Sequence, residues 1–210
     1  MPSSVPDSIP EIINFMLFLK PNSILDIGAG AGKYGVLFRE YLELCTYGPS
    51  ERKRHIYIDA VEAYPSYIYE LHHCIYDNIY VQTIEDCLNE LGSYDLIFMG
   101  DLIEHFSKEE GLQLLFKLMS HANKAIAVVT PLSDIKQGPW FGNMLEIHKS
   151  HWKKRDFKKI ARTYSIPANS QMIYVLSRDD SIYKYFNIWS RLKRALRGTF
   201  NRIIAFERQF

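Results

Sequence analysis

The sequence has few cysteines and no long apolar run. Its three cysteines, Cys45, Cys74 and Cys87, are widely spaced and fit neither a metal-ligand motif nor a disulfide framework. A reducing cytoplasm is therefore the expected location. The apolar run 12–19 is shorter than the roughly 20 residues that cross a bilayer. It also lacks the basic segment and small-residue cleavage site of a signal peptide.

The sequence also has little net charge, but the charge is unevenly distributed. The 210 residues carry a formal charge of +1, with 47% hydrophobic and 23% charged residues, as in one ordinary globular domain. Residues 181–210 contain seven Lys or Arg and one acid, whereas the rest of the chain is acidic. Apolar residues recur there at helical spacing, so we predict a basic amphipathic helical tail over 178–210 after a domain at 1–177. Such a tail could dock on the body, pair a homodimer, or contact RNA or an anionic membrane surface.

The remaining chain alternates apolar strands with helical segments. Ser8 and Glu11 resemble a capping box before an N-terminal helix at 8–19. Strands are predicted at 23–27, 55–61, 79–82, 94–99, 125–130, 163–166 and 172–177, and helices at 33–44, 66–74, 85–91, 108–121 and 153–161. This alternation predicts an α/β fold with a doubly wound, mostly parallel sheet covered by helices on both faces.

The most informative segment is the strand and glycine-rich turn SILDIGAGAGKYG, residues 23–35. Alternating glycines allow a sharp turn and a close ligand. A phosphate-binding P-loop is excluded, because Tyr34 follows Gly32-Lys33 where Ser or Thr is required. A dinucleotide fingerprint fits only in the frame Gly30-Gly32-Gly35, which leaves NAD open. The acid Asp26 would repel a pyrophosphate, and it suits a cationic ligand better.

The pattern acid-x-Gly-x-Gly-x-Gly resembles the first motif of the class I S-adenosylmethionine-dependent methyltransferases. The resemblance covers about 23–177 and implies a Rossmann-like, three-layer fold of seven strands, the last antiparallel between the fifth and sixth. It implies S-adenosylmethionine as cofactor and S-adenosylhomocysteine as product.

An acid after the second strand, here Glu62, would accept the ribose hydroxyls, as it also could in an NAD enzyme. The family often has an acid where Thr83 stands, so the adenine contact passes to Ile84, Glu85 or Asp86. The predicted cofactor residues are Asp26, Gly28, Ala29, Gly30, Gly32, Tyr34, Glu62, Ala63, Ile84, Glu85 and Asp101.

The acceptor side is expected around DLIEHF, where Asp101, Glu104 and His105 would share one helix face. Residues 130–152 form a long loop at the same sheet edge, a candidate lid that contains His148. The predicted catalytic residues are Asp101, His105 and His148. A histidine general base would activate the acceptor, because the imidazole pKa is close to neutral pH.

The residues of the acceptor side resemble two groups of methyltransferases, one that needs no metal and one that binds a divalent metal. The Glu-His pair resembles metal-free small-molecule O-methyltransferases such as those of quinone biosynthesis. The wider pattern is similar to enzymes that methylate the terminal 2′-hydroxyl of small RNAs, in which two acids and two histidines hold a divalent metal. The matching residues are Asp101, Glu104, His105 and His148, with Asp101 standing where that family has Glu.

We therefore expect a methyltransferase that acts on a nucleophile, preferably oxygen, of a small molecule or sugar. A metal-assisted RNA-end 2′-O-methyltransferase, an NAD-dependent oxidoreductase and a non-catalytic cofactor-binding module are the alternatives. The sequence does not identify the acceptor.

Overall fold

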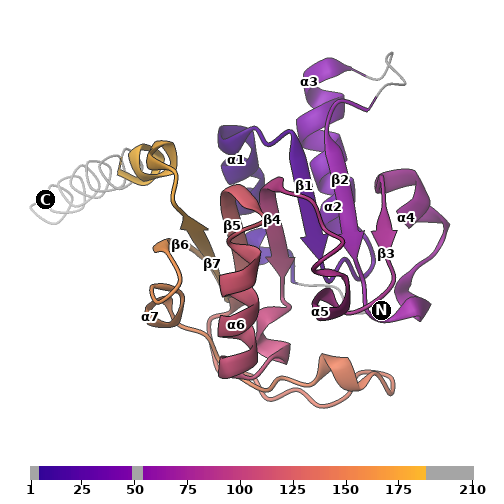
Figure 1. Ribbon diagram of the computed structural model, residues 1–210, viewed down its shortest axis with the longest axis vertical. Helices are drawn as coiled ribbons and strands as arrows, with labels where there is room; N and C mark the ends of the chain where they lie inside the picture. The colour runs from indigo at the N-terminus through magenta and orange to yellow at the C-terminus, as the bar shows by residue number, and fades with distance from the viewer. Residues whose placement is uncertain (1–4, 49–53, 188–210) are drawn as a thin grey trace, which may run out of the picture. The chain divides into compact units, whose positions relative to one another are not determined.

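One mixed sheet organises the molecule in the computed structural model, which describes residues 5–48 and 54–187 (Figure 1). Seven strands of the described chain are ordered β3-β2-β1-β4-β5-β7-β6. The first five are parallel, and β7 runs antiparallel between β5 and β6. The predicted α/β class and strand order are confirmed. The strands are β1 (Ser23–Ile27), β2 (Tyr57–Val61), β3 (Ile79–Tyr80), β4 (Tyr94–Gly100), β5 (Ala122–Pro131), β6 (Arg162–Ala168) and β7 (Gln171–Ser177).

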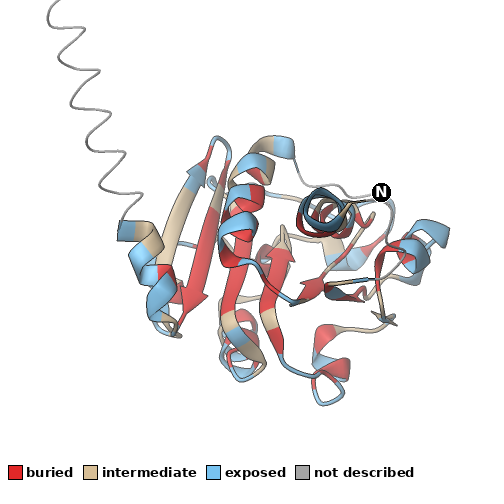
Figure 2. Cartoon of the chain, turned by 90° about the horizontal axis from the view of Figure 1, so that it is seen from above, coloured by how far each residue is buried: buried red, intermediate tan, exposed pale blue. Residues whose placement is uncertain are grey.

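The central strands are apolar because helices cover both of their faces (Figure 2). In β1, Ile24 and Leu25 point to opposite faces and both are fully buried. Phe38 of α2 packs on Phe98 of β4 on one face, whereas the core of the other face includes residues of α5, α6 and α7. The α-helices are α1 (Ile9–Leu19), α2 (Lys33–Phe38), α3 (Cys45–Tyr47), α4 (Glu70–Ile75), α5 (Ile84–Cys87), α6 (Lys108–Leu118) and α7 (Lys154–Phe157).

Several predicted helices differ from the observed ones. The helix predicted at 33–44 changes after α2 into a π-helical stretch, η2 (Arg39–Leu44). The segment 66–74 divides into the 3-10 turn η3 (Pro65–Tyr67) and α4, because the backbone of Ile68 is extended. The predicted helices at 85–91, 108–121 and 153–161 are all shorter, as α5, α6 and α7. Element ends are the least certain part of a sequence-based assignment.

The predicted capping box at Ser8 is wrong. A 3-10 turn, η1 (Pro6–Ser8), precedes α1, so Ser8 already has helical backbone angles and caps no N–H group. Its hydroxyl instead forms a 3.1 Å hydrogen bond with the hydroxyl of Tyr34 in α2.

The chain divides into two compact units, residues 1–178 and 179–210. Within the second unit, residues 180–187 are helical, and the rest of the predicted basic tail lies outside the described residues. The amphipathic tail, its partners and the proposed boundary at 177 therefore stay predictions. In the described residues, no helix is long and apolar enough to cross a membrane.

Trp152 anchors the long segment after β5 to the sheet. Trp152 is 1% exposed, its Nε1 donates a 3.0 Å hydrogen bond to the carbonyl oxygen of Ile103, and its ring packs against that of Phe157 at a tilt of 37°. Gly111 of α6 lies against this ring, and a Cβ at Gly111 would be 2.5 Å from the Trp152 Cζ2 atom.

We expect Gly111→Ala to lower the free energy of unfolding by about 1–2 kcal/mol. Overpacking against a fixed, buried ring outweighs the gain in helix propensity. Gly92→Ala is the matched control, because a Cβ there meets no atom within 4 Å. Urea unfolding of both variants measures the difference, and equal stability of both would contradict this packing argument.

Candidate active site

The glycine-rich turn after β1 forms one wall of the site. Gly28, Gly30 and Gly32 have φ angles of 73°, 53° and 77°, which side-chain-bearing residues rarely adopt. The N–H groups of Gly28 and Ala29 both donate to the carbonyl oxygen of Val61, at 2.8 and 3.3 Å. The turn is thereby fixed to the end of β2, with bare backbone facing the site.

Glu62 lies at the end of β2, directly against this turn. Its Oε2 accepts a 2.8 Å hydrogen bond from the N–H of Gly30, and its Oε1 accepts one of 2.8 Å from the N–H of Tyr64. Burial raises the pKa of Glu62 above its usual value, although these two hydrogen bonds oppose the shift. The carboxyl of Glu62 is therefore largely buried and fixed beside the turn by two hydrogen bonds.

Asp26 lies beneath the turn. Its carboxyl is 2% exposed and accepts a 2.7 Å hydrogen bond from the hydroxyl of Tyr76. Burial raises the pKa of Asp26 to about 7, the Tyr76 hydrogen bond opposes this shift, and the negative charge of Glu62 adds to it. Asp26 does not line the cavity described next.

A cavity of about 700 Å³ opens at the carboxyl end of the parallel strands. This edge is where ligands bind in doubly wound sheets. Of the predicted cofactor residues, those that line it are Gly28, Ala29, Gly30, Tyr34, Glu62, Ala63, Ile84, Glu85 and Asp101, whereas Asp26 and Gly32 do not. The candidate lid also lines it, through residues that include Ile135, Trp140, Leu145, Glu146 and His148.

Asp101 follows β4, but it is not on a helix as expected. Its φ angle is 49°, and only Ile103–His105 forms a 3-10 turn, so Asp101, Glu104 and His105 do not share one helix face. All three nevertheless line the cavity. Gln171, the first residue of β7, donates from Nε2 to both carboxyl oxygens of Asp101 at 2.7 Å. Gln171 is a site residue that the sequence analysis missed.

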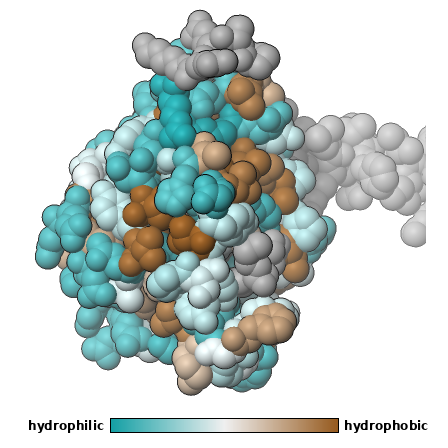
Figure 3. All heavy atoms as spheres, turned by 90° about the vertical axis from the view of Figure 1, so that its right-hand side faces the viewer, coloured by the Kyte–Doolittle hydropathy of each residue, from teal (hydrophilic) through white to brown (hydrophobic). Residues whose placement is uncertain are grey.

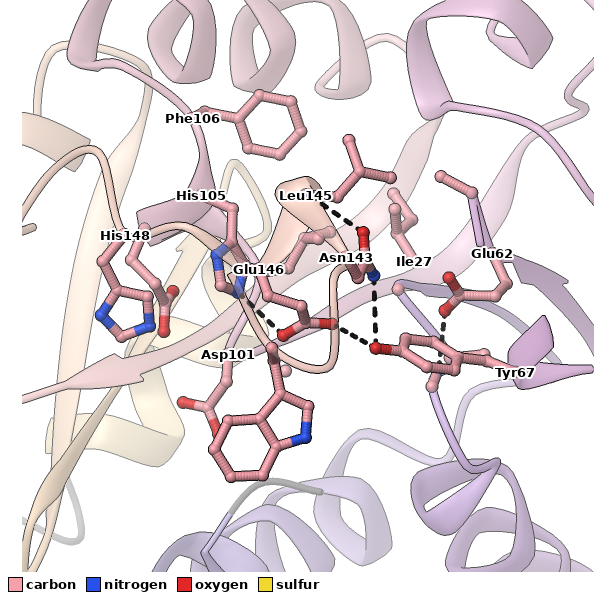
Figure 4. A pocket seen from close by; sticks show the side chains of 18 of the residues that line it. Ile27, Glu62, Tyr67, Asp101, His105, Phe106, Asn143, Leu145, Glu146 and His148 are labelled. Carbon is pink, nitrogen blue, oxygen red and sulfur yellow. Dashed lines mark hydrogen bonds and ion pairs between the residues drawn. The ribbon is translucent and has the colours of Figure 1, made fainter. Parts of the chain in front are cut away.

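His105 and His148 come together at the other end of the cavity, with ring centroids 5.0 Å apart (Figure 4). The Nδ1 atom of His105 lies 3.2 Å from the carbonyl oxygen of Ile147, and that of His148 lies 2.8 Å from the carbonyl oxygen of Ile135. Because a carbonyl only accepts, we assign the proton of each neutral ring to Nδ1. This assignment leaves both Nε2 atoms with a lone pair. Burial lowers the pKa of His105.

Three further residues complete this end and were missed from the sequence (Figure 4). Glu146 Oε2 lies 4.0 Å from the Nε2 atom of His105. The hydroxyl of Tyr67 donates to Glu146 Oε1 at 3.2 Å, and Asn143 Nδ2 donates to that hydroxyl at 3.2 Å. No local signal marks Tyr67 or Asn143, whereas Glu146 stands two residues before His148 in the candidate lid.

The predicted metal ligands do not form a metal site. Across residues 5–48 and 54–187, no group of three or more His, Cys, Asp or Glu side chains is arranged to hold an ion. His148 directs Nδ1 to the carbonyl oxygen of Ile135, and Asp101 accepts hydrogen bonds from Gln171. Glu104 is 2% exposed, and neither carboxyl oxygen has a hydrogen-bond partner among the described residues. Burial, and then the charge of Asp101, raise the pKa of Glu104 to about 8.

The cavity lining is acidic. It contains six carboxyl side chains and two lysines, which are Glu62, Glu85, Asp101, Glu104, Glu110, Glu146, Lys33 and Lys149. A lining of this charge disfavours a pyrophosphate or a nucleic-acid backbone and favours a cationic ligand.

Comparison with known proteins places the chain in a family. A family model described as a methyltransferase domain matches residues 3–169. No curated protein matches the sequence significantly.

Solved structures have the same fold at low identity. An O-methyltransferase family protein from Burkholderia thailandensis has a TM-score of 0.58 and 13% identity over 82% of this chain. This chain spans only 56% of that protein. Magnesium protoporphyrin IX methyltransferase from Synechocystis PCC 6803, with bound SAH, has a TM-score of 0.55 and 14% identity, covering 82% of both chains. A SAM-dependent methyltransferase from Archaeoglobus fulgidus has a TM-score of 0.56 and 14% identity, covering 80% of this chain and 92% of its own.

The family match covers well over half of the sequence, and the strand order and the glycine turn agree with it. The chain therefore belongs to the methyltransferase-domain family.

Proposed function

We propose that the enzyme transfers a methyl group from S-adenosylmethionine to a hydroxyl oxygen of a small molecule. The observation that carries this proposal is the pair His105 and His148, each with Nδ1 beside a main-chain carbonyl oxygen, so that Nε2 is the basic atom of each neutral ring. Two structures of similar fold are named an O-methyltransferase family protein and mitomycin 7-O-methyltransferase, which supports oxygen as the acceptor atom.

The residues at the glycine end fit the cofactor. S-adenosylmethionine carries an ammonium and a sulfonium and no phosphate, which suits the acidic lining. Glu62 would accept the ribose hydroxyls, and Ala63, Ile84 and Glu85 would border the adenine. Asp101 would face the ammonium, with Asp26 acting through water from beneath the turn. Gly28 lies against Leu102, since a Cβ there would be 3.0 Å from the Leu102 Cδ1 atom.

His105 is the proposed general base. When bound, S-adenosylmethionine would supply a methyl group on a positively charged sulfur, and the electron pair of the broken C–S bond would stay on that sulfur. The acceptor proton passes to Nε2 of His105, and the carboxylate of Glu146 at 4.0 Å stabilises the imidazolium. Tyr67 and Asn143 hold Glu146 in place. The rest of the rate comes from holding the acceptor oxygen and the methyl group in line.

S-adenosylhomocysteine should bind the wild type, and Glu62→Ala should weaken binding about 10- to 100-fold, because two charged hydrogen bonds to the ribose are lost. Glu62→Gln keeps one acceptor oxygen and should weaken the binding of S-adenosylhomocysteine less than Glu62→Ala does. Glu146→Gln is the matched control, since it removes a carboxylate from the opposite end of the cavity and should leave the affinity within about twofold. Calorimetric titration measures all four proteins.

Thermal unfolding of the same variants shows whether a lower affinity comes from a lost contact or from a less stable fold. A wild type that binds NADH and not S-adenosylhomocysteine would overturn the cofactor assignment.

His105→Asn should lower kcat for transfer to a phenolic probe such as catechol by about 10²–10⁴-fold, the usual contribution of a general base. His148→Asn is the matched control and should have a smaller effect. Because burial lowers the pKa of His105 and the neutral ring is the active form, the rate should fall only below about pH 6.5. The rate is measured as the amount of S-adenosylhomocysteine released over time. Full activity of His105→Asn would rule this base out.

A further inference from the structure

The tip of the candidate lid is a tight hairpin turn. Trp140 and Asn143 form an isolated antiparallel bridge, with N–H to carbonyl oxygen distances of 3.3 and 2.9 Å. The two residues between them, Phe141 and Gly142, have φ angles of 45° and 83°. Positive φ at both central positions is the pattern of a type I′ turn, which favours Asn, Asp or Gly at the first of them.

Phe141 is unfavourable at this position in two ways. A left-handed backbone costs a residue with a bulky side chain about 1–2 kcal/mol. The ring is also 87% exposed, the largest exposure among the large apolar side chains of the described residues. Met144 and Leu145, the two residues after the turn, are exposed as well. Strained and exposed features of this kind tend to persist where a function requires them.

This apolar tip is continuous with the cavity. The ring of Phe141 packs edge-on against Trp140, with centroids 5.3 Å apart and an interplanar angle of 87°. Trp140 and Leu145 line the cavity and are 45% and 51% exposed. Figure 3 shows apolar side chains at the bottom of this face, at the height where Figure 1 draws η5 (Met144–Glu146). The apolar surface therefore runs from the cavity wall to the outside of the tip.

The tip is held in this position from its base. Asn143 Nδ2 donates to the hydroxyl of Tyr67, and Gln137 Nε2 donates to the carbonyl oxygen of Glu146 at 2.8 Å. The N–H groups of Lys149 and Ser150 donate to the carbonyl oxygen of Glu104. A fixed apolar rim beside the polar pair of His105 and His148 is suited to a ligand with one polar end and one apolar end.

We propose that the methyl acceptor is an amphiphile, whose hydroxyl-bearing head enters the cavity and whose apolar part lies along Trp140, Phe141 and Met144. This inference rests on the proposed function. The continuity of the tip with the cavity favours the acceptor itself as the occupant over a second copy of the chain or a bilayer, neither of which would enter the cavity.

Titration of 4-hexylphenol and phenol into the S-adenosylhomocysteine complex tests the proposal. Each buried methylene strengthens binding by up to about fourfold, so hexylphenol should bind at least about tenfold more tightly than phenol. Phe141→Asn should reduce that preference about fivefold and leave phenol binding unchanged. Because Asn suits this backbone better, the same variant should unfold at a higher temperature than the wild type.

The matched control is Phe116→Gln, which removes another exposed ring, on α6 and outside the cavity lining, and should leave the preference unchanged. Equal binding of the two phenols, or an unchanged preference in Phe141→Asn, would overturn the proposal. So would self-association of the wild type, or binding to phosphatidylcholine vesicles, if Phe141→Asn abolished it. Failure to bind S-adenosylhomocysteine would instead count against the proposed function.

Discussion

The main-chain carbonyl of Glu104 joins the two halves of the site. It accepts hydrogen bonds from the N–H groups of Lys149 at 2.8 Å and Ser150 at 3.1 Å, 45 residues or more along the chain. The hydroxyl of Ser150 donates to the carbonyl oxygen of Phe106, and Trp152 bonds Ile103 in the same way. The end of the candidate lid is thus bonded to the turn after β4. Together with the contact between His105 Nδ1 and the carbonyl oxygen of Ile147, these bonds bring Glu146 and His148 opposite His105.

A cluster of carboxyl groups, some of them protonated near neutral pH, is a second constraint on the site. Burial raises the pKa of Asp26, Glu62, Glu104 and Glu146 together, because each carboxylate loses water and several face one another. Such a site favours a cation more strongly than any single carboxylate would. It also explains how one sheet edge that resembles a dinucleotide site can discriminate against a pyrophosphate.

The glycine turn and Glu62 could be predicted because their signal is local. A short apolar strand followed by alternating glycines specifies its own backbone, and parallel strands bring their ends to one edge. By contrast, Gln171 reaches Asp101 from 70 residues away, and Tyr67 meets Glu146 across 79 residues. The spacing of residues in the sequence does not predict pairs that are this far apart. The prediction that Asp101, Glu104 and His105 share one helix face was wrong for a related reason, because the backbone of Asp101 is left-handed and only Ile103–His105 forms a 3-10 turn.

The bond between Gln171 and Asp101 also has a consequence for biosynthesis. Asp101 is clamped only when β7 has inserted between β5 and β6, and β7 is the last strand of the sheet to leave the ribosome. A nascent chain can pair β1, β2 and β4 and form the glycine turn well before that moment. The bond between Gln171 and Asp101 is therefore completed late in synthesis, so chains truncated before β7 lack this part of the cavity wall even where most of their sheet has formed.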